Sequence, residues 1–127
     1  MPGVAFGADV ANLPASLKDP YSEARNCMAC GAFTAAAMIA RKILMNVALS
    51  LGSGVRDSFK SYVDWLAENG HVTPRSKGWV DHIRDKGNEA NHEIPQVTKK
   101  DAENVIVFLE MLLKTNFEYP DRVPKGN

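Results

Sequence analysis

The chain has 127 residues, of which 45% are hydrophobic and 24% charged, and its formal net charge is zero. This length suits one domain with one core. Because the charges balance, the net charge of the chain gives no support for nucleic-acid binding. No apolar run is long enough to span a bilayer, and the N-terminus lacks the basic and apolar stretches of a secretory signal. We therefore expect a cytoplasmic protein with no membrane partner.

Residues 1–19 contain several glycines and prolines without periodicity, which predicts an irregular N-terminal arm. The first helix is expected to begin near Pro20, with Asp19 as its cap, and to run to about Leu51. Its apolar residues step by three or four: Met28, Ala32, Ala36, Ile39, Ile43 and Val47. This pattern predicts a long, central, well-buried helix that ends at Gly52.

A second helix is predicted over roughly Arg56 to Glu68, where Asn69-Gly70 ends it. A third is predicted from about Thr73 to near His92, ahead of the break at Ile94-Pro95. Thr98, with Asp101 three residues later, resembles a capping box and begins a fourth helix that ends at Tyr119-Pro120. Residues 121–127 are polar and are predicted to form a flexible tail.

No segment alternates as a strand would over more than a few residues. The predicted fold is therefore all-α, with an antiparallel bundle of four main helices over residues 20–120.

The third predicted helix carries the candidate site residues. Arg84, Asn88 and His92 follow one another at four-residue steps, so they share one face of a helix. Arginine can hold a phosphate bidentately, and a neutral histidine can act as a general base. Asn88 can orient either partner, and Asp81 and Asp85 fall in the same sector of the helix, which we call the polar stripe. This arrangement can support metal-free cleavage of RNA through attack of a 2′-hydroxyl. The alternative is a solvated polar face or a network that locks the helix.

Two further motifs carry polar chemistry. Arg41 interrupts an apolar helix. It is either an arginine at the edge of the bundle or a binding residue. In the second case its side chain reaches the polar stripe of the third predicted helix and pairs with an acidic residue such as Asp85. Cys27 and Cys30 form a C-x-x-C pair, but a zinc site needs about four ligands and there is no second pair. We therefore predict no metal and no cofactor, and interpret the cysteines as small residues on a packed helix.

Several local patterns resemble a bacterial helical family known as domain of unknown function 4145. They are the helix opening at Tyr21-Ser22-Glu23-Ala24, the segment from Ile83 to His92, and the ending Phe117-Glu118-Tyr119-Pro120. This family looks like a branch of the HEPN superfamily. The resemblance implies an up-and-down bundle that dimerises, with active members acting as metal-independent ribonucleases of toxin–antitoxin, restriction and phage-defence systems. In that pattern Asn88 and His92 match the polar residue and the histidine, and Arg84 supplies the arginine.

Seven residues separate Arg84 from His92, whereas the common motif of the superfamily leaves four to six. The first hypothesis in order is therefore a noncatalytic homodimeric module that binds RNA, a nucleotide or a restriction or toxin–antitoxin partner protein. The alternative is a metal-independent endoribonuclease that uses Arg84, Asn88 and His92. A third hypothesis gives these residues a purely structural role, so the sequence leaves enzymatic activity open.

Overall fold

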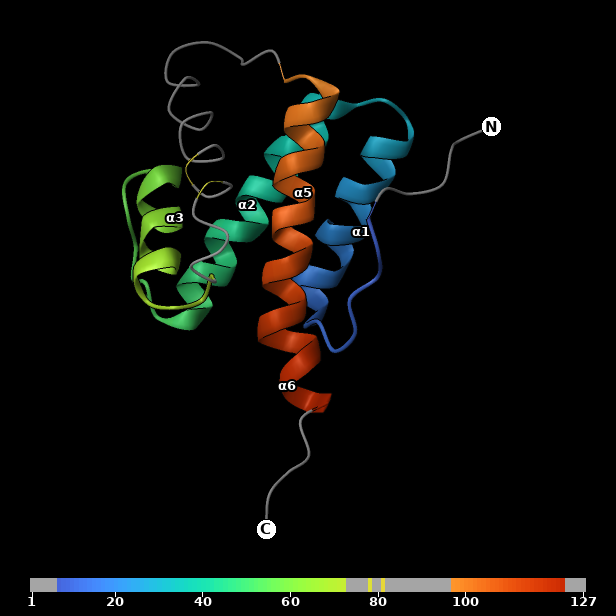
Figure 1. The fold of residues 1–127 in the computed structure, drawn as a ribbon. Helices are drawn as coiled ribbons and strands as arrows, with labels where there is room; N and C mark the ends of the chain where they lie inside the picture. Colours follow the sequence, from blue (N-terminus) through green and yellow to red (C-terminus); the bar gives the residue numbers. More distant parts are fainter. Residues whose placement is uncertain (1–6, 73–77, 79–80, 82–96, 123–127) are drawn as a thin grey trace.

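A computed structural model describes residues 7–72, 78, 81 and 97–122 of the chain. The main helices in these ranges are α1 (Ala15–Ala29), α2 (Phe33–Leu51), α3 (Phe59–Glu68) and α5 (Lys99–Leu113), as Figure 1 shows. A π-helical turn, η2 (Lys114–Glu118), and the short α6 (Tyr119–Arg122) extend α5. There is no strand among the described residues, so the all-α prediction is confirmed there. Most of the third predicted helix lies outside them.

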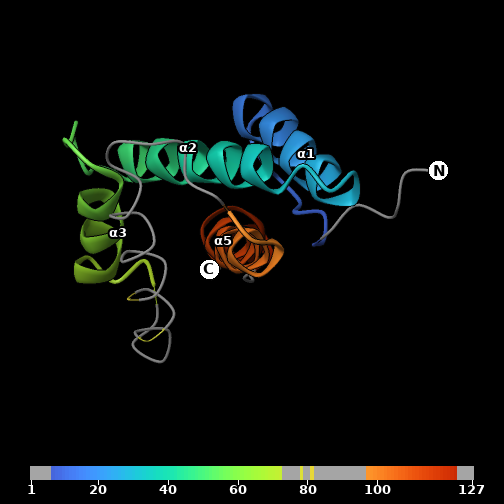
Figure 2. The same ribbon diagram turned by 90° about the horizontal axis from the view of Figure 1, so that it is seen from above.

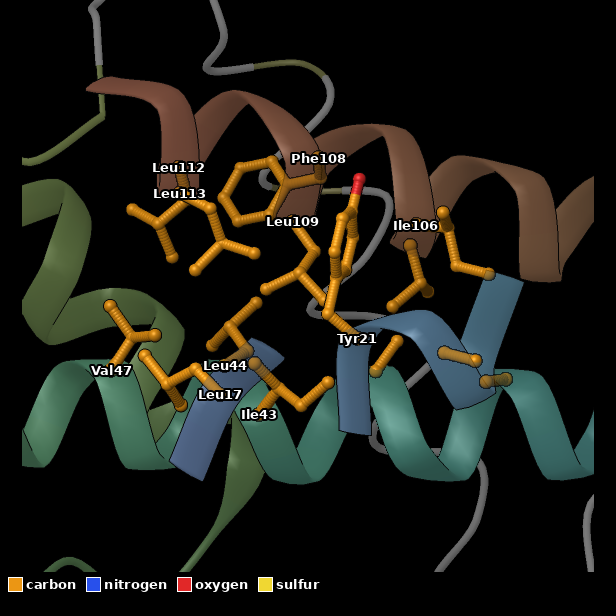
Figure 3. Packing of buried hydrophobic residues seen from close by; sticks show 14 of the residues in the cluster. Leu17, Tyr21, Ile43, Leu44, Val47, Ile106, Phe108, Leu109, Leu112 and Leu113 are labelled. Carbon is orange, nitrogen blue, oxygen red and sulfur yellow. The ribbon is translucent and has the colours of Figure 1, made fainter. Parts of the chain in front are cut away.

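Helix α2 occupies the centre and contacts α1, α3 and α5. Figure 2 shows α1 and α5 against its N-terminal part and α3 beside its C-terminal end. Buried alanines on α2 let its neighbours approach closely, and larger side chains fill the core between α1, α2 and α5 (Figure 3). The side chains labelled there are Leu17, Tyr21, Ile43, Leu44, Val47, Ile106, Phe108, Leu109, Leu112 and Leu113.

By length and composition α2 could also cross a membrane, so the expectation that no apolar run is long enough was too strict. The fold accounts for its apolar character in another way. Its buried residues belong to the core cluster shared with α1 and α5. A core helix needs the same composition.

The single long helix predicted from Pro20 to Leu51 is wrong, because the chain turns between α1 and α2. Gly31 adopts a φ of 78°, which an L side chain rarely takes. The Ala32 N–H donates to the Cys27 carbonyl (2.8 Å) and the Gly31 N–H to the Met28 carbonyl (3.1 Å). These two bonds form a Schellman motif that closes α1. Apolar residues keep their helical spacing on both sides of this turn, so the spacing alone did not reveal the break between the two helices.

Helix α1 also begins earlier than predicted. It starts at Ala15, after Pro14, and Pro20 lies inside it instead of at its first position. The N–H groups of Leu17 and Lys18 both donate to the Pro14 carbonyl at 2.9 Å. The turn before Pro20 is therefore already helical, and α1 tolerates an internal proline that lacks a donor.

The predicted limits of α3 and α5 are nearer to the observed ones. Helix α3 begins at Phe59, three residues after Arg56, because Ser58 caps it, and it ends at Glu68 as expected. In α5 the Thr98 side chain accepts the N–H of Asp101, which confirms the predicted cap. The predicted end at Tyr119-Pro120 is wrong. The wider turn η2 precedes Pro120, and the helical path continues to Arg122.

Candidate functional site

Four residues of the predicted polar stripe, Arg84, Asp85, Asn88 and His92, lie outside the described residues, whereas Asp81 is described and is half-buried. Their common face on a helix therefore stays a prediction. Arg41, the remaining predicted binding residue, is described, and it marks the part of the candidate site that has a geometry. We build the site outward from this side chain.

Arg41 lies at the border between the buried and exposed faces of α2 and is half-buried. Its guanidinium lies over the ring of Phe59, with 4.7 Å between the guanidinium carbon and the ring centroid. This distance is within the range of a cation–π interaction. Burial lowers the pKa of the guanidinium from its ordinary value, but arginine titrates so high that the charge persists at neutral pH. The contact thus holds a positive charge at the junction of α2 and α3.

Arg56 adds a second cation just before α3. Its backbone N–H donates to the Tyr62 hydroxyl (3.0 Å), and its Nη1 donates to the Ser61 hydroxyl (3.3 Å). Its Nε is buried and has no hydrogen-bond partner among the described residues. The segment leading into α3 is therefore fixed at both its backbone and its side chain, and one guanidinium N–H is unpaired within that part of the structure.

The N-terminus of α3 lies at the same junction. Ser58 accepts the Ser61 N–H (3.1 Å), and the first turn of the helix carries no acidic residue. The partial positive charge of a helix N-terminus favours anions. Exposed Lys42 and Lys60 follow Arg41 and Phe59 in the sequence and add positive charge to α2 and α3. We name Arg41, Arg56, Phe59 and the start of α3 the junction site, and its chemistry suits an anionic ligand.

Sequence reasoning identified Arg41 but missed its partner. That partner is Phe59, which is half-buried and lies under the guanidinium of Arg41. Arg56 was not singled out at all. One signal in the sequence was available. An arginine in an apolar helix needs a partner, and an aromatic ring can serve as that partner as well as a carboxylate can.

The other end of α3 carries an aromatic pair that the sequence did not reveal. The rings of Trp65 and His71 stack with centroids 5.2 Å apart and planes at 25°. The His71 N–H donates to the Leu66 carbonyl (3.0 Å), so the turn at Asn69-Gly70 brings the imidazole back onto the helix. This contact fixes the end of α3, and it lies at the opposite end from the junction site.

The two cysteines are free thiols. Cys27 is half-buried against the core, whereas Cys30 is exposed at the end of α1, so the expectation of a pair on a packed helix holds only for Cys27. Within residues 7–72, 78, 81 and 97–122, no group of three or more His, Cys, Asp or Glu side chains is placed to hold a metal ion.

Comparison with known proteins identifies the chain only at the level of a family. The family model described as "Domain of unknown function (DUF4145)" matches residues 22–125, which is most of the sequence. No curated protein and no solved structure matches.

Proposed function

The chain belongs to the DUF4145 family, and on that premise we propose that it is a homodimeric module that binds RNA or a nucleotide through the junction site. The ligand's phosphate lies against Arg41 and Arg56. The module is noncatalytic in this proposal, because the spacing between Arg84 and His92 departs from that of active HEPN proteins.

The observation that carries this proposal is the position of Arg41 over Phe59. An arginine spread over an aromatic ring keeps its outer edge available, because the ring neutralises no charge and takes no hydrogen bond. Arg56 adds a second guanidinium charge and the start of α3 adds a helix dipole, both within three residues of Phe59 in the sequence. Phosphate oxygens satisfy all three kinds of group.

The proposal includes an antiparallel, HEPN-like arrangement that dimerises in the cytoplasm. The short turn from α1 to α2 and the shared core of α1, α2 and α5 support such a bundle. The outer face of α2 exposes 51% of Met38 and 38% of Leu49, with half-buried Met45 on the same side, and supports dimerisation through an apolar surface. Sedimentation velocity tests the dimer; a single species of 13.9 kDa would contradict it.

Binding is tested by the fluorescence anisotropy of a labelled single-stranded RNA, with ATP as a competitor. We expect saturable binding that weakens as salt rises, with about 0.7 logarithmic units lost per logarithmic unit of salt for each phosphate contacted. Two contacts, to Arg41 and Arg56, predict a slope of about −1.4. Anisotropy that stays flat up to high protein concentration would exclude the proposed function.

A second candidate function is metal-independent cleavage of RNA, which the four-residue spacing of Arg84, Asn88 and His92 favours. His92 would act as the acid or base, Arg84 would stabilise the phosphate, and Asn88 would orient them. The test is cleavage of mixed RNA in EDTA by the wild type and by His92→Ala. Equal cleavage by both proteins, or none by the wild type, rules this function out.

We further propose that the module serves a bacterial defence or restriction-type system, in which its partner is a restriction or toxin–antitoxin protein. The resemblance to HEPN proteins motivates this setting. Deleting the chain from its host should increase the number of plaques formed by phages that the intact host resists. An unchanged plaque number for a broad phage panel would contradict the defence role.

A further inference from the structure

Residues 7–11 of the N-terminal arm lie against α1 and the C-terminal end of α5, and two carboxylates hold their backbone. The Ala8 N–H donates to Glu110 Oε1 (2.6 Å), and the Ala11 N–H donates to Glu118 Oε1 (2.8 Å). Glu118 is only 7% exposed and lies in the π-helical turn η2. The wider turn thus directs a buried carboxylate toward the arm.

Two side chains of α1 hold the carbonyl side of the same segment. The Tyr21 hydroxyl donates to the Ala8 carbonyl (2.7 Å), and Arg25 Nη2 donates to the Gly7 carbonyl (3.1 Å). Arg25 Nη1 also pairs with the Asp9 carboxylate at 2.5 Å. The backbone of the arm is therefore bound through both its N–H groups and its carbonyl groups.

Four of these five contacts reach the backbone of the arm and not its side chains. Ala8, Asp9 and Ala11 are exposed, and only Val10 is buried. The groove formed by Tyr21, Arg25, Glu110 and Glu118, which we call the arm groove, recognises the backbone of residues 7–11 and the acidic side chain of Asp9. Such recognition does not depend on which copy of the chain supplies the segment.

The connection between the arm and α1 is a tight turn. Asn12 has a φ of 66° and is the one non-glycine residue with a left-handed backbone in the described part of the chain. Pro14 follows with the extended angles φ −56° and ψ 149°. If Asn12 also became extended, the arm would point away from its own α1 and the strained conformation would be released.

We propose that two copies of this chain exchange their N-terminal arms, so that residues 7–11 of each copy occupy the arm groove of the other. The occupant follows from the structure, because the segment shown to fit the groove is the arm, and a second copy carries an identical one. The exchange is reciprocal, as a two-fold dimer requires. This inference rests on the proposed homodimer and adds a reciprocal contact between its two subunits, besides the apolar face of α2.

A charge swap tests the exchange in the full-length chain. One variant carries Asp9→Arg and the other carries Arg25→Glu, so within either variant alone positions 9 and 25 have like charges, in cis or in trans. In a mixture, only exchanged arms place opposite charges together at both grooves. Native mass spectrometry distinguishes the two variants and their heterodimer by mass.

Arm exchange predicts that, in an equimolar mixture, the ratio of heterodimer to total homodimer rises at least about fivefold above its statistical value of about one, because two partly exposed ion pairs replace two repulsions. A statistical distribution of dimers would overturn the exchange and leave the homodimer standing. If the wild type and both variants are monomers, the homodimer of the proposed function fails as well.

Two glycine variants keep the test valid if a charge variant does not fold. Gly7 and Gly54 have φ values of 83° and 69°, so alanine is strained at both. A Cβ at position 7 would meet Glu110 Oε1 at 3.2 Å, whereas nothing lies within 4 Å of one at position 54. Exchange predicts that Gly7→Ala weakens the dimer at least about fivefold more than Gly54→Ala does. Equal dissociation constants in sedimentation would overturn it.

Discussion

The guanidinium of Arg41 lies over the ring of Phe59 and thereby joins the central helix α2 to the start of α3. The interaction stabilises the charge where burial alone would disfavour it, and burial does lower the pKa of this guanidinium. It also restricts the arginine to one region of the surface. The same contact thus serves the packing of α3 and the positioning of a cation.

Replacing the ring should show both roles. Phe59→Leu keeps an apolar side chain but removes the aromatic face, so we expect the free energy of unfolding to fall by about 1 kcal/mol. Urea denaturation followed by circular dichroism measures this. Affinity for RNA should fall several-fold, because Arg41 loses its fixed position. Phe33→Leu is the matched control, since Phe33 is also half-buried against the core. Equal RNA affinities of the two variants would contradict a positioning role for Phe59.

Tyr21 predicts a dependence of stability on alkaline pH. Burial raises the pKa of its phenol, and the nearby Glu110 raises it further. The unfolded phenol ionises near pH 10, while the folded one keeps its proton, so stability is full below pH 10 and falls as the pH rises above it. The slope reaches about 1.4 kcal/mol per pH unit for one such group.

Tyr21→Phe should remove this component of the alkaline slope. It also deletes the hydrogen bond to the Ala8 carbonyl, which should cost about 1 kcal/mol at neutral pH. Urea denaturation at a series of pH values from 8 to 11 measures both effects. An unchanged alkaline slope in Tyr21→Phe would show that the phenol is not protected in the folded chain.

The cap of α5 gives a third prediction. Thr98→Ala removes the side-chain acceptor of the Asp101 N–H (3.1 Å) and should destabilise the chain by about 1 kcal/mol. Thr98→Ser retains an acceptor and should leave stability within about 0.5 kcal/mol of the wild type. Thermal unfolding of the three proteins makes the comparison, and a loss of equal size in both variants would argue against the cap.

Features of the fold that depend on local chemistry were predictable. The cap at Thr98 and the stops at Gly52 and Asn69-Gly70 follow from side-chain and backbone preferences, and all are observed. The break at Gly31 was missed because alanines allow the apolar period to continue through it. The helical paths across Pro20 and Pro120 were missed because an internal proline is permitted only when its surroundings stabilise the helix, which the local sequence does not express.

The site was predictable only in part. Arg41 stood out as a cation in an apolar helix, but its stacking on Phe59 joins residues 18 positions apart and depends on how α3 folds back onto α2. The contacts of the arm span still more of the chain, since Ala11 meets Glu118. Neither contact can be predicted from the spacing of residues along the sequence. The stripe of Arg84, Asn88 and His92 remains a prediction.

The most direct test of the proposed function compares Arg41→Gln with Lys42→Gln in RNA binding by fluorescence anisotropy. Each variant removes one positive charge from adjacent positions on α2, but only Arg41 contacts Phe59. We predict that Arg41→Gln weakens binding about tenfold and reduces the salt slope by about 0.7, while Lys42→Gln changes affinity less than twofold. Equal losses in the two variants, or none in Arg41→Gln, would contradict binding at the junction site.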